Sequence, residues 1–406
     1  MVSTAASLFW IALCAVIAPL LAGLVPRRLI PEVVLLLALG VVIGPGALGL
    51  AAVGEGLEVL HELGLGMLFL LAGYEIELRK LTGHGGRRAL VTWLICFALA
   101  LGLVGFAGLI GAINAEIAVA IALVSTALGA LLPILKDNGQ LDTRLGAAVL
   151  NHGAFGELCP IIAMALLLST SVTLASIGVL VIFAVVAVIF TLPAVHLRHG
   201  SRAHQIITGS SETTAQITVR LVVLLLVSLG GLAIAFDLDV VLGAFAAGFV
   251  LRRALPEGDE SLEHKLDGLA FGLLIPIFFI TSGMNIGPQA IADNPLGLVI
   301  FVVAIVVIRG GPIYLASRMD RVPHTHDRVF SNLESVQIAL YGATGLPVIV
   351  AVTAVATKSE RMTSENASLL VAGGAITVLL LPMTAALLGL RGEQRETEDS
   401  AATTSR

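Results

Sequence analysis

Two ionisable residues, Glu157 and Arg309, lie deep inside apolar stretches and are the strongest candidates for chemistry. Glu157 stands in VLNHGAFGELCPIIAMALLL (149–168), and Arg309 stands in FVVAIVVIRGGPIYL (301–315). An ionised side chain at the centre of a bilayer costs about 3 kcal/mol on insertion scales, so such residues normally face a partner or a water-filled transport path. The two residues therefore predict ion or proton transport. The alternative is a structural ion pair, which is a weak source of stability because desolvation offsets the attraction.

The elements that must position these residues are membrane-spanning helices. The 406 residues are 57% hydrophobic and 13% charged, and apolar stretches near twenty residues recur along the chain. About 20 apolar residues cross a hydrocarbon core of about 30 Å, so the composition predicts an all-α polytopic membrane protein. A net charge of −5 gives no indication of a nucleic-acid partner. The sequence has no phosphate-binding loop, GxGxxG or HExxH motif, so we expect neither enzyme activity nor a cofactor.

The apolar pattern predicts about 13 transmembrane spans. Their approximate limits are 5–25, 30–52, 60–78, 89–111, 116–135, 145–168, 172–195, 217–236, 240–252, 267–284, 296–317, 332–357 and 366–390. With the N-terminus outside and the C-terminus in the cytoplasm, the cytoplasmic links and the tail carry 20 of the 23 Lys and Arg residues. The external links carry only Lys358 and Arg361, as the positive-inside rule requires. The N-terminus lacks the basic segment of a signal peptide, which fits a first span entering from outside.

Two short motifs occur twice in the same order, with a spacing near 210 residues. LFLLAGYEI (68–76) matches FFITSGMNI (278–286), and ALGVV (38–42) matches AAGFV (246–250). An odd number of spans separates the copies, which predicts inverted repeats of the kind found in secondary transporters. Chance similarity between apolar segments is the alternative. The predicted organisation is a transmembrane domain at 1–390, with repeat one at about 5–168, a linking helix at 172–195, repeat two at about 217–390, and a short cytoplasmic tail at 391–406.

The fifth and twelfth spans both contain residues that loosen a helix near its middle. The fifth reads IALVSTALGALLPILK (121–136), and the twelfth reads ALYGATGLPVIVAVTA (339–354). Helices interrupted at membrane depth expose backbone carbonyls and helix ends that suit a small ion. We therefore expect two broken helices, with Ser125, Thr126 and Thr344 as candidate polar groups at the breaks.

These segments in order resemble the monovalent cation:proton antiporter-2 family of the sodium/hydrogen exchanger superfamily, including the membrane domain of Kef-type potassium-efflux systems. The similarity runs through PEVVLLLALGVVIGPGALGL (31–50), ELGLGMLFLLAGYEIELRKL (62–81), LVSTALGALLPILKDNGQLDTRLGAAVL (123–150), VVLGAFAAGFVL (240–251) and IPIFFITSGMNIGPQAI (275–291). The resemblance implies the sodium/proton antiporter fold, with inverted repeats and two broken crossing helices. It also implies a homodimer.

The resemblance assigns roles to individual residues. The family carries paired site residues on its sixth span, and an ungapped comparison places Gly156 and Glu157 at that pair. Glu157 is then the carboxylate that binds the proton and the transported Na⁺ or K⁺. Arg309 falls where the family has a Lys or Arg facing the site, and Ser125 and Thr126 match the polar break of the fifth helix. Gly156 departs from the pattern, because it removes the first polar partner.

Two further residues near Glu157 depart from the family pattern. Asn151 and His152 lie one to two turns before Glu157, where small apolar residues are more usual. His152 is five residues from Glu157, a rotation of about 140°, so the two side chains do not share a helix face. His152 is either a proton relay in a cytoplasmic funnel or a packed histidine between helices. Asn151, His152 and Thr344 are possible accessory groups of the site.

The resemblance implies a secondary active transporter that exchanges protons for Na⁺ or K⁺ at a cell membrane. Burial favours the protonated form of Glu157 and Arg309 favours the charged form, so a proton and a cation compete for one carboxylate. The expected partners are these ions, the lipid bilayer and a second copy of the chain. The alternatives are a transport-inactive sensor or scaffold and a channel-like potassium-efflux subunit. A single carboxylate with hydroxyl and carbonyl oxygens suits either cation, so the sequence leaves the choice open.

Overall fold

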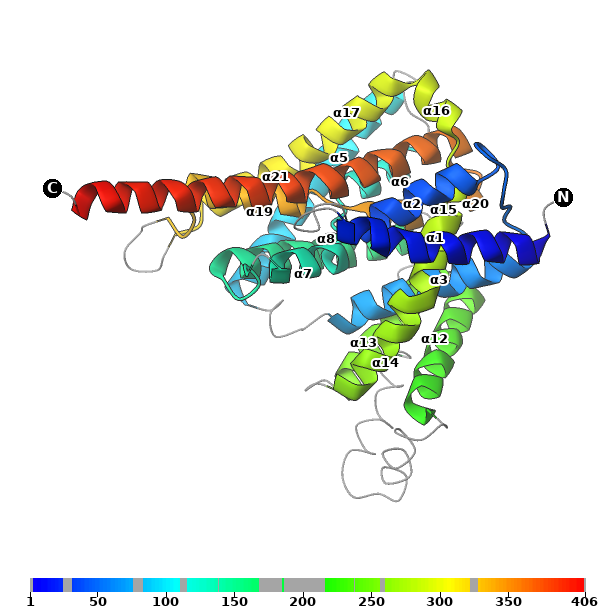
Figure 1. The fold of residues 1–406 in the computed structure, drawn as a ribbon. Coiled ribbons are helices and arrows are strands. Elements are labelled where there is room, and N and C mark those ends of the chain that lie inside the picture. Colours follow the sequence, from blue (N-terminus) through cyan, green and yellow to red (C-terminus); the bar gives the residue numbers. More distant parts are fainter. Residues whose placement is uncertain are drawn as a thin grey trace, which may run out of the picture. The chain divides into compact units, whose positions relative to one another are not determined.

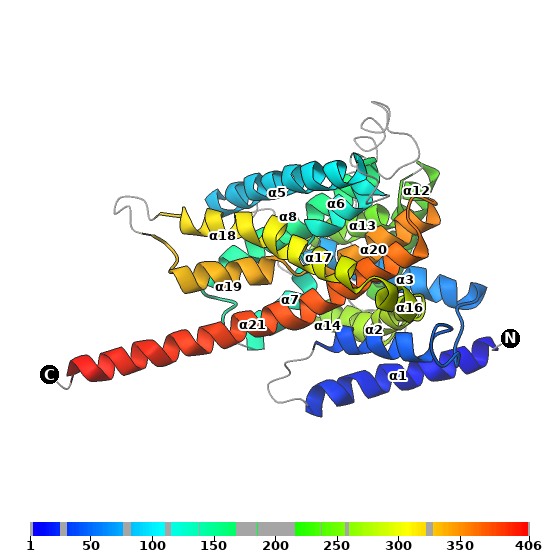
Figure 2. The same ribbon diagram turned by 90° about the horizontal axis from the view of Figure 1, so that it is seen from above.

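The computed structural model (Figures 1 and 2) describes residues 3–24, 31–75, 83–109, 115–137, 139–167, 185, 216–236, 238–255, 260–321 and 328–404. Across these residues the chain is helical and forms no β-strand, apart from an isolated bridge between Arg321 and Arg328. Nine helices in these ranges are long and apolar enough to cross a membrane. The prediction of an all-α polytopic membrane protein is therefore confirmed.

The helices follow the predicted spans with two notable differences in their limits. The predicted span 30–52 becomes the shorter helix α2 (Glu32–Ile43), because Gly44 and Pro45 follow it and a proline disfavours helix at itself and at the residue before it. The predicted tail 391–406 is largely helical, since α21 (Ser364–Thr404) continues through most of it. The predicted linking helix 172–195 lies almost entirely outside the described residues, so the total of about 13 spans stays a prediction.

The chain forms two compact units, and each unit takes residues from both halves of the sequence. The first comprises Met1–Ala18, Leu36–Glu77 and Ile161–Asn285, and the second comprises Pro19–Leu35, Leu78–Pro160 and Ile286–Arg406. Three helices pass from one unit into the other: α1 (Thr4–Leu24), α2 and α8 (Arg144–Leu167). The predicted repeats are therefore not compact units themselves, and their limits stay a prediction.

The first unit is held together by close helix crossings at glycine. Its other helices are α3 (Glu55–Glu75), α12 (Ile217–Ala235), α13 (Val240–Ala254), α14 (Glu260–Leu269), the π-helical turn η2 (Ala270–Leu274) and α15 (Ile275–Met284). Where α3 crosses α13, a Cβ on Gly73 would overlap the carbonyl of Phe245, and one on Gly248 would overlap the carbonyl of Leu70. Only glycine permits this approach, which is how small residues bring membrane helices together.

A second crossing in the same unit repeats this arrangement. Where α2 meets α15, a Cβ on Gly40 would overlap the carbonyl of Ile280, and one on Gly283 would overlap the carbonyl of Leu37. Gly40 and Gly248 occupy the same place in one duplicated motif, and Gly73 and Gly283 occupy the same place in the other. Each crossing therefore joins the first motif of one half to the second motif of the other half, as equivalent halves require.

The second unit contains both predicted broken helices, and both breaks are confirmed. The first is α6 (Glu116–Leu123) followed by α7 (Leu128–Asp137), and the second is α19 (Asn332–Gly342) followed by α20 (Leu346–Lys358). The unit also contains α5 (His84–Leu109), α16 (Pro288–Asp293), α17 (Pro295–Ile305), the π-helical turn η3 (Val306–Gly310) and α18 (Gly311–Arg318). Helix α19 starts at a capping box, in which the Glu334 N–H donates to the Ser331 hydroxyl at 3.1 Å and the Ser331 N–H to the Glu334 carboxylate at 2.7 Å.

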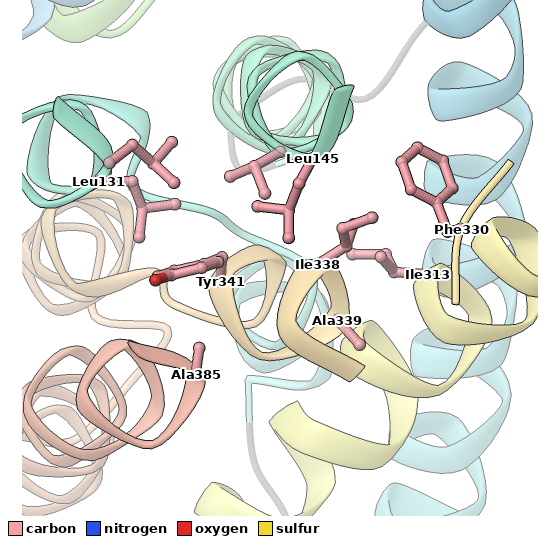
Figure 3. Close-up of a cluster of buried hydrophobic side chains, with 10 residues drawn as sticks. Leu131, Leu145, Ile313, Phe330, Ile338, Ala339, Tyr341 and Ala385 are labelled. Carbon is pink, nitrogen blue, oxygen red and sulfur yellow. The ribbon is translucent and has the colours of Figure 1, made fainter. Parts of the chain in front are cut away.

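An apolar cluster in the second unit fixes the broken helices against their neighbours (Figure 3). Its side chains come from α7, α8, α18, α19 and α21, with one from the loop before α19: Leu131, Leu135, Leu145, Val149, Ile313, Phe330, Ile338, Ala339, Tyr341 and Ala385. Helix α21, the long red helix of Figures 1 and 2, packs beside α19 and α20. The Gln337 side chain adds a polar contact there, since its amide donates to the Ala385 carbonyl at 2.9 Å. One segment of each broken helix, α7 in the first and α19 in the second, is therefore held in this apolar cluster.

Candidate ion-binding site

The breaks of the two interrupted helices are bonded directly to each other. The Ala127 N–H donates to the Thr344 carbonyl at 2.5 Å. The Ser125 hydroxyl donates to the Ala122 carbonyl at 2.9 Å and lies 3.3 Å from the Gly345 carbonyl oxygen. A Cβ on Gly345 would overlap the hydroxyl and carbonyl of Ser125, so glycine is required at this close approach. One backbone hydrogen bond and one hydroxyl contact thus join the two breaks, which helps to satisfy their non-helical backbone.

Thr126 joins the first break to two further helices. Its N–H donates to the Gly156 carbonyl in α8 at 2.8 Å. Its hydroxyl donates to the Gly342 carbonyl at the end of α19 at 2.6 Å. Gly342 lies in the last turn of α19, where carbonyls lack helical partners because the helix is interrupted. Thr126 is therefore the residue at which the first break, the second break and α8 meet.

Arg309 reaches the same point from η3 and is fully buried. Its Nε lies 3.2 Å and its Nη2 3.1 Å from the Thr126 hydroxyl oxygen. Nη2 also donates to the His152 carbonyl at 2.8 Å, and Nε lies 3.3 Å from the Gly342 carbonyl. The hydroxyl oxygen of Thr126 and the carbonyl oxygens of Gly342 and His152 form what we call the oxygen cradle. The remaining nitrogen, Nη1, lies 3.9 Å from the sulfur of Cys96.

The π-helical turn η3 carries Arg309 as its fourth residue. A π-turn inserts one residue into a helix and rotates the side chains that follow, and such turns are frequent at functional sites. The turn ends at Gly310, followed by Gly311 and Pro312 at the start of α18. Pro312 has no N–H to donate into the preceding turn, which favours the wider spacing. Arg309 therefore projects from a widened turn of the helix.

Gly156 leaves room for the guanidinium of Arg309. A Cβ at residue 156 would overlap Nη2 of Arg309 and the hydroxyl of Thr126. The space that a side chain at residue 156 would need is thus occupied by the guanidinium of Arg309 and the hydroxyl of Thr126. Glu157 follows on α8 and is buried, with 5% of its surface exposed. The structure therefore brings together Ser125, Thr126, Gly156 and Arg309 at the breaks, with Glu157 next in the chain to Gly156.

The other three predicted residues take part differently. The Thr344 hydroxyl donates to the Tyr341 carbonyl of the preceding helix end at 2.8 Å, so it is the Thr344 carbonyl that joins the two breaks. His152 contributes its backbone carbonyl to the oxygen cradle, while its buried Nδ1 has no hydrogen-bond partner within the described residues. Asn151 packs instead at the start of α5, where a Cβ on Gly85 would lie 2.8 Å from its amide nitrogen.

Sequence reasoning missed the parts of this site that the backbone and sulfur supply. The carbonyls of Gly342 and His152 have no sequence signal, because every residue carries one. Cys96 lies among apolar residues of α5 like any buried thiol, and its sulfur lies 3.8 Å from the Arg309 carbonyl. The one available signal was the Gly-Gly-Pro after Arg309, which favours an irregular turn in a helix.

The site is built from oxygen ligands. Hydroxyl and carbonyl oxygens are the ligands that hard cations prefer. Within the described residues, no group of three or more His, Cys, Asp or Glu side chains gathers as a transition metal would require. These oxygen atoms are of the kind that small hard cations prefer, and the buried carboxylate of Glu157 follows Gly156 in the chain.

Comparison with known proteins identifies the family. A sequence model described as "Sodium/hydrogen exchanger, transmembrane" matches residues 12–390. The chain belongs to the sodium/hydrogen exchanger family. Members of this family are membrane transporters, and the chain is accordingly a multi-pass membrane transporter rather than an enzyme. The sequence-based prediction of the family is confirmed.

Individual sodium/hydrogen exchanger relatives agree with this result. The chain is 26% identical over 273 residues to "Probable Na(+)/H(+) antiporter GerT" of Bacillus cereus, covering 65% of this chain and 70% of GerT. It is 29% identical over 314 residues to "Glutathione-regulated potassium-efflux system protein KefC" of Escherichia fergusonii, covering 72% of this chain and 47% of KefC. The chain thus spans about half the length of KefC.

A solved structure confirms the antiporter fold. The sodium proton antiporter MjNhaP1 from Methanocaldococcus jannaschii, determined at pH 8, superposes with a TM-score of 0.60. The match covers 95% of this chain and 98% of MjNhaP1, at 16% sequence identity. The similarity extends over nearly the whole of both chains, so the fold of this exchanger family member is that of sodium/proton antiporters.

Proposed function

We propose that this chain exchanges protons for a monovalent cation, Na⁺ or K⁺, at Glu157. The observation that carries the proposal is the position of this buried carboxylate, directly after the residue whose carbonyl accepts the Thr126 N–H. A buried carboxylate beside neutral oxygen atoms can hold either a proton or a small cation. Competition between the two for one group is what couples their movement in opposite directions. Both cations are represented among the relatives, since GerT is named for Na⁺ and KefC for potassium.

The proposed ligands are Glu157, the hydroxyl of Thr126 and the polar groups of Ser125 and Thr344. Their support is the direct bonding between the two breaks, which holds carbonyl and hydroxyl oxygens at one point of the second unit. Helix α8 carries Glu157 and passes from the second unit into the first at Pro160. We propose that a change in the relation of the two units exposes the site alternately to each side of the membrane.

The test is cation-dependent proton flux in proteoliposomes that contain the purified protein. Flux is measured with Na⁺, K⁺ and Li⁺ for the unmodified protein and for Glu157→Gln. We expect the substitution to abolish flux with every cation while the protein stays folded and inserted. Glu116→Gln is the matched control, because Glu116 is an exposed acid at the start of α6 and should be dispensable. Full exchange activity in Glu157→Gln would remove Glu157 as the carrier.

A second function is a transport-inactive sensor or scaffold. The observation that favours it is the oxygen cradle, which is filled by Arg309 and leaves the Thr126 hydroxyl without a free lone pair. If the guanidinium never leaves, the unmodified protein gives no proton flux with any cation. A third function, a channel-like potassium-efflux subunit, is favoured by the similarity to KefC and would give potassium flux without proton movement.

We also propose a plasma-membrane location, an external N-terminus, a cytoplasmic C-terminus and a homodimer. The orientation is supported by the 20 of 23 basic residues in the predicted cytoplasmic links and tail. Single cysteines introduced at Ser3 and Thr403, in a background without native cysteines, are treated from outside intact cells with a membrane-impermeant maleimide. Labelling of Ser3→Cys alone is expected. The mass of the purified protein in detergent tests the dimer.

A further inference from the structure

Arg309 is a fully buried cation held largely by neutral oxygen atoms. Its guanidinium makes four hydrogen bonds to the oxygen cradle, at 3.2 and 3.1 Å to the Thr126 hydroxyl, 2.8 Å to the His152 carbonyl and 3.3 Å to the Gly342 carbonyl. Neutral hydroxyl and carbonyl oxygens are also the natural ligands of an alkali cation. The cradle therefore already contains one positive charge, and that charge is attached to the protein.

The Thr126 hydroxyl has no lone pair left for a second cation. A hydroxyl group has one donor and two acceptor positions. The donor position is directed at the Gly342 carbonyl at 2.6 Å, and the two acceptor positions receive Nε and Nη2 of Arg309. A Na⁺ or K⁺ ion at the same oxygen would also lie next to the guanidinium in a medium of low dielectric constant, where like charges repel strongly. Occupancy by Arg309 and occupancy by a metal cation are therefore mutually exclusive at Thr126.

Glycine at residue 156 is what gives the guanidinium this place. A Cβ at residue 156 would overlap both Nη2 of Arg309 and the Thr126 hydroxyl. Any other amino acid here would push the guanidinium away from the oxygen cradle or displace Thr126. The absence of a side chain at Gly156 thus leaves the space that the guanidinium of Arg309 occupies.

We propose that Arg309 is a tethered competitor of the transported cation: its guanidinium occupies the oxygen cradle in the cation-free state and must leave before Na⁺ or K⁺ can bind Thr126. The competition with Na⁺ or K⁺ rests on the proposed function, whereas the occupancy of the oxygen cradle by Arg309 does not. The oxygen cradle is accordingly a binding site for a guanidinium group, and the side chain of Arg309 occupies it. When the Arg309 side chain is removed, the vacated cradle accepts guanidinium from solution.

The first experiment measures binding without transport. Purified Arg309→Ala in detergent is heated with and without a few millimolar methylguanidinium, and choline chloride at the same concentration controls for ionic strength. The unfolding temperature of Arg309→Ala is expected to lie below that of the unmodified protein and to rise by about 2–5 °C with methylguanidinium. The unmodified protein is expected to show no such rise, because its cradle is full.

Two variants make this result specific to the cradle. Arg88→Ala is the matched control, since Arg88 lies in the same unit but pairs with Asp320 at a partly exposed site. Methylguanidinium is expected to leave it unchanged, because water fills the space that Arg88 leaves. Adding Gly156→Ala to Arg309→Ala places a methyl group in the cradle and is expected to abolish the response. An equal response in all variants, or none in Arg309→Ala, overturns the proposal.

A failure of Arg309→Ala to fold without a cation in its cradle is itself informative, because the cradle oxygens then lack their donors. Addition of methylguanidinium during expression and purification is in that case expected to recover folded protein, whereas choline is not. If neither recovers it, Arg309→Gln provides the decisive measurement. The glutamine amide keeps part of the hydrogen bonding, and it has no charge to compete with a cation.

The second experiment measures competition during transport. In proteoliposomes, Arg309→Gln is expected to lower the half-saturating concentration of the transported cation by about fivefold or more relative to the unmodified protein. A purely structural arginine predicts an unchanged or higher value, and that result overturns the proposal. The two ideas also fail separately. If Arg309→Ala binds methylguanidinium but the unmodified protein shows no cation-dependent proton flux, the proposed antiport function is wrong. If there is flux but Arg309→Ala does not bind methylguanidinium, only the proposed role of Arg309 is wrong.

Discussion

The backbone N–H of Thr126 donates a 2.8 Å hydrogen bond to the carbonyl of Gly156. Thr126 lies in the first break, and Gly156 directly precedes the buried carboxylate of Glu157, so this bond links the shape of the break to the carboxylate. The Thr126 hydroxyl links the same point to α19 and η3 through Gly342 and Arg309. Residue 126 is consequently where a small change should have the largest effect on the site.

Replacing Thr126 by Val keeps the branched shape and removes the hydroxyl. Arg309 then loses an acceptor and Gly342 loses a donor at buried positions, so we expect a loss of about 2–4 kcal/mol in stability and loss of transport. Thr126→Ser keeps the hydroxyl and should retain most of both. The unfolding temperature in detergent and cation-dependent proton flux measure the two effects.

The control for this prediction is Thr353→Val. Thr353 is also buried, in α20, but its hydroxyl donates at 2.9 Å to the Val350 carbonyl of its own helix. Its loss should cost less than about 1 kcal/mol, because no second helix depends on it. Similar losses from the two valine substitutions would contradict the special position of Thr126.

Gly345→Ala tests the contact between the two breaks. An added methyl group would overlap the hydroxyl and carbonyl of Ser125, so the breaks must separate, and we expect a loss of about 1–3 kcal/mol with impaired transport. Gly129→Ala in α7 is the comparison, because nothing lies within 4 Å of its added Cβ. That change should be neutral or raise stability by about 0.5–1 kcal/mol, since alanine favours a helix. Unchanged stability and transport in Gly345→Ala would show that the close approach of the two breaks is not required.

Gly73→Ala and Gly283→Ala test whether the two crossings of the first unit are equivalent. Both added methyl groups meet backbone carbonyls, which cannot move aside as side chains do. We therefore expect both substitutions to lower the unfolding temperature by a similar amount. Gly268→Ala, at an open position of α14, should have little effect. If only one of the two substitutions lowers the unfolding temperature, the two crossings do not contribute equally to stability.

We expect one proton to be exchanged for each cation. Gly156 has no titratable side chain, and Arg309 keeps its charge at any relevant pH. Glu157 is then the group whose charge is neutralised by either ion, so the loaded carrier has the same net charge in both directions. In proteoliposomes with a fixed pH gradient, the Na⁺-dependent exchange rate should not depend on a potential set by valinomycin and potassium. A strong dependence would indicate a second proton and would make His152→Gln the next variant to measure.

The places of both breaks, and the burial of Glu157 and Arg309, could be predicted from the sequence. A charge in an apolar stretch and Gly, Ser, Thr or Pro in a helix are local signals, and local signals do not depend on which helices become neighbours. The duplicated motifs contain the glycines of both crossings, although the sequence alone indicated only a repeat and not which helices these glycines bring together.

The partners of Arg309 could not be predicted in the same way. Charge alone suggested Glu157, whereas the guanidinium is bound to Thr126 and to two backbone carbonyls. The choice of acceptor depends on the direction of the side chain, which the π-turn η3 sets, and on the space left by Gly156. Neither the direction of the side chain nor this space can be predicted from the hydropathy pattern. The division into two units was also hidden, because segments distant in sequence must be packed together before it exists.

The glycine crossings have a consequence for how the two halves of the chain hold together. Gly40 and Gly283 share one crossing and Gly73 and Gly248 share the other, so each contact takes one surface from each half. A polypeptide cut between residues 168 and 215 should yield two fragments that are each incomplete, with carbonyl-lined faces that only the other fragment covers. Made together they should reassemble, and made alone they should be degraded. The first unit should accordingly depend on the association of the two halves, and the covalent link between them keeps that association within one molecule.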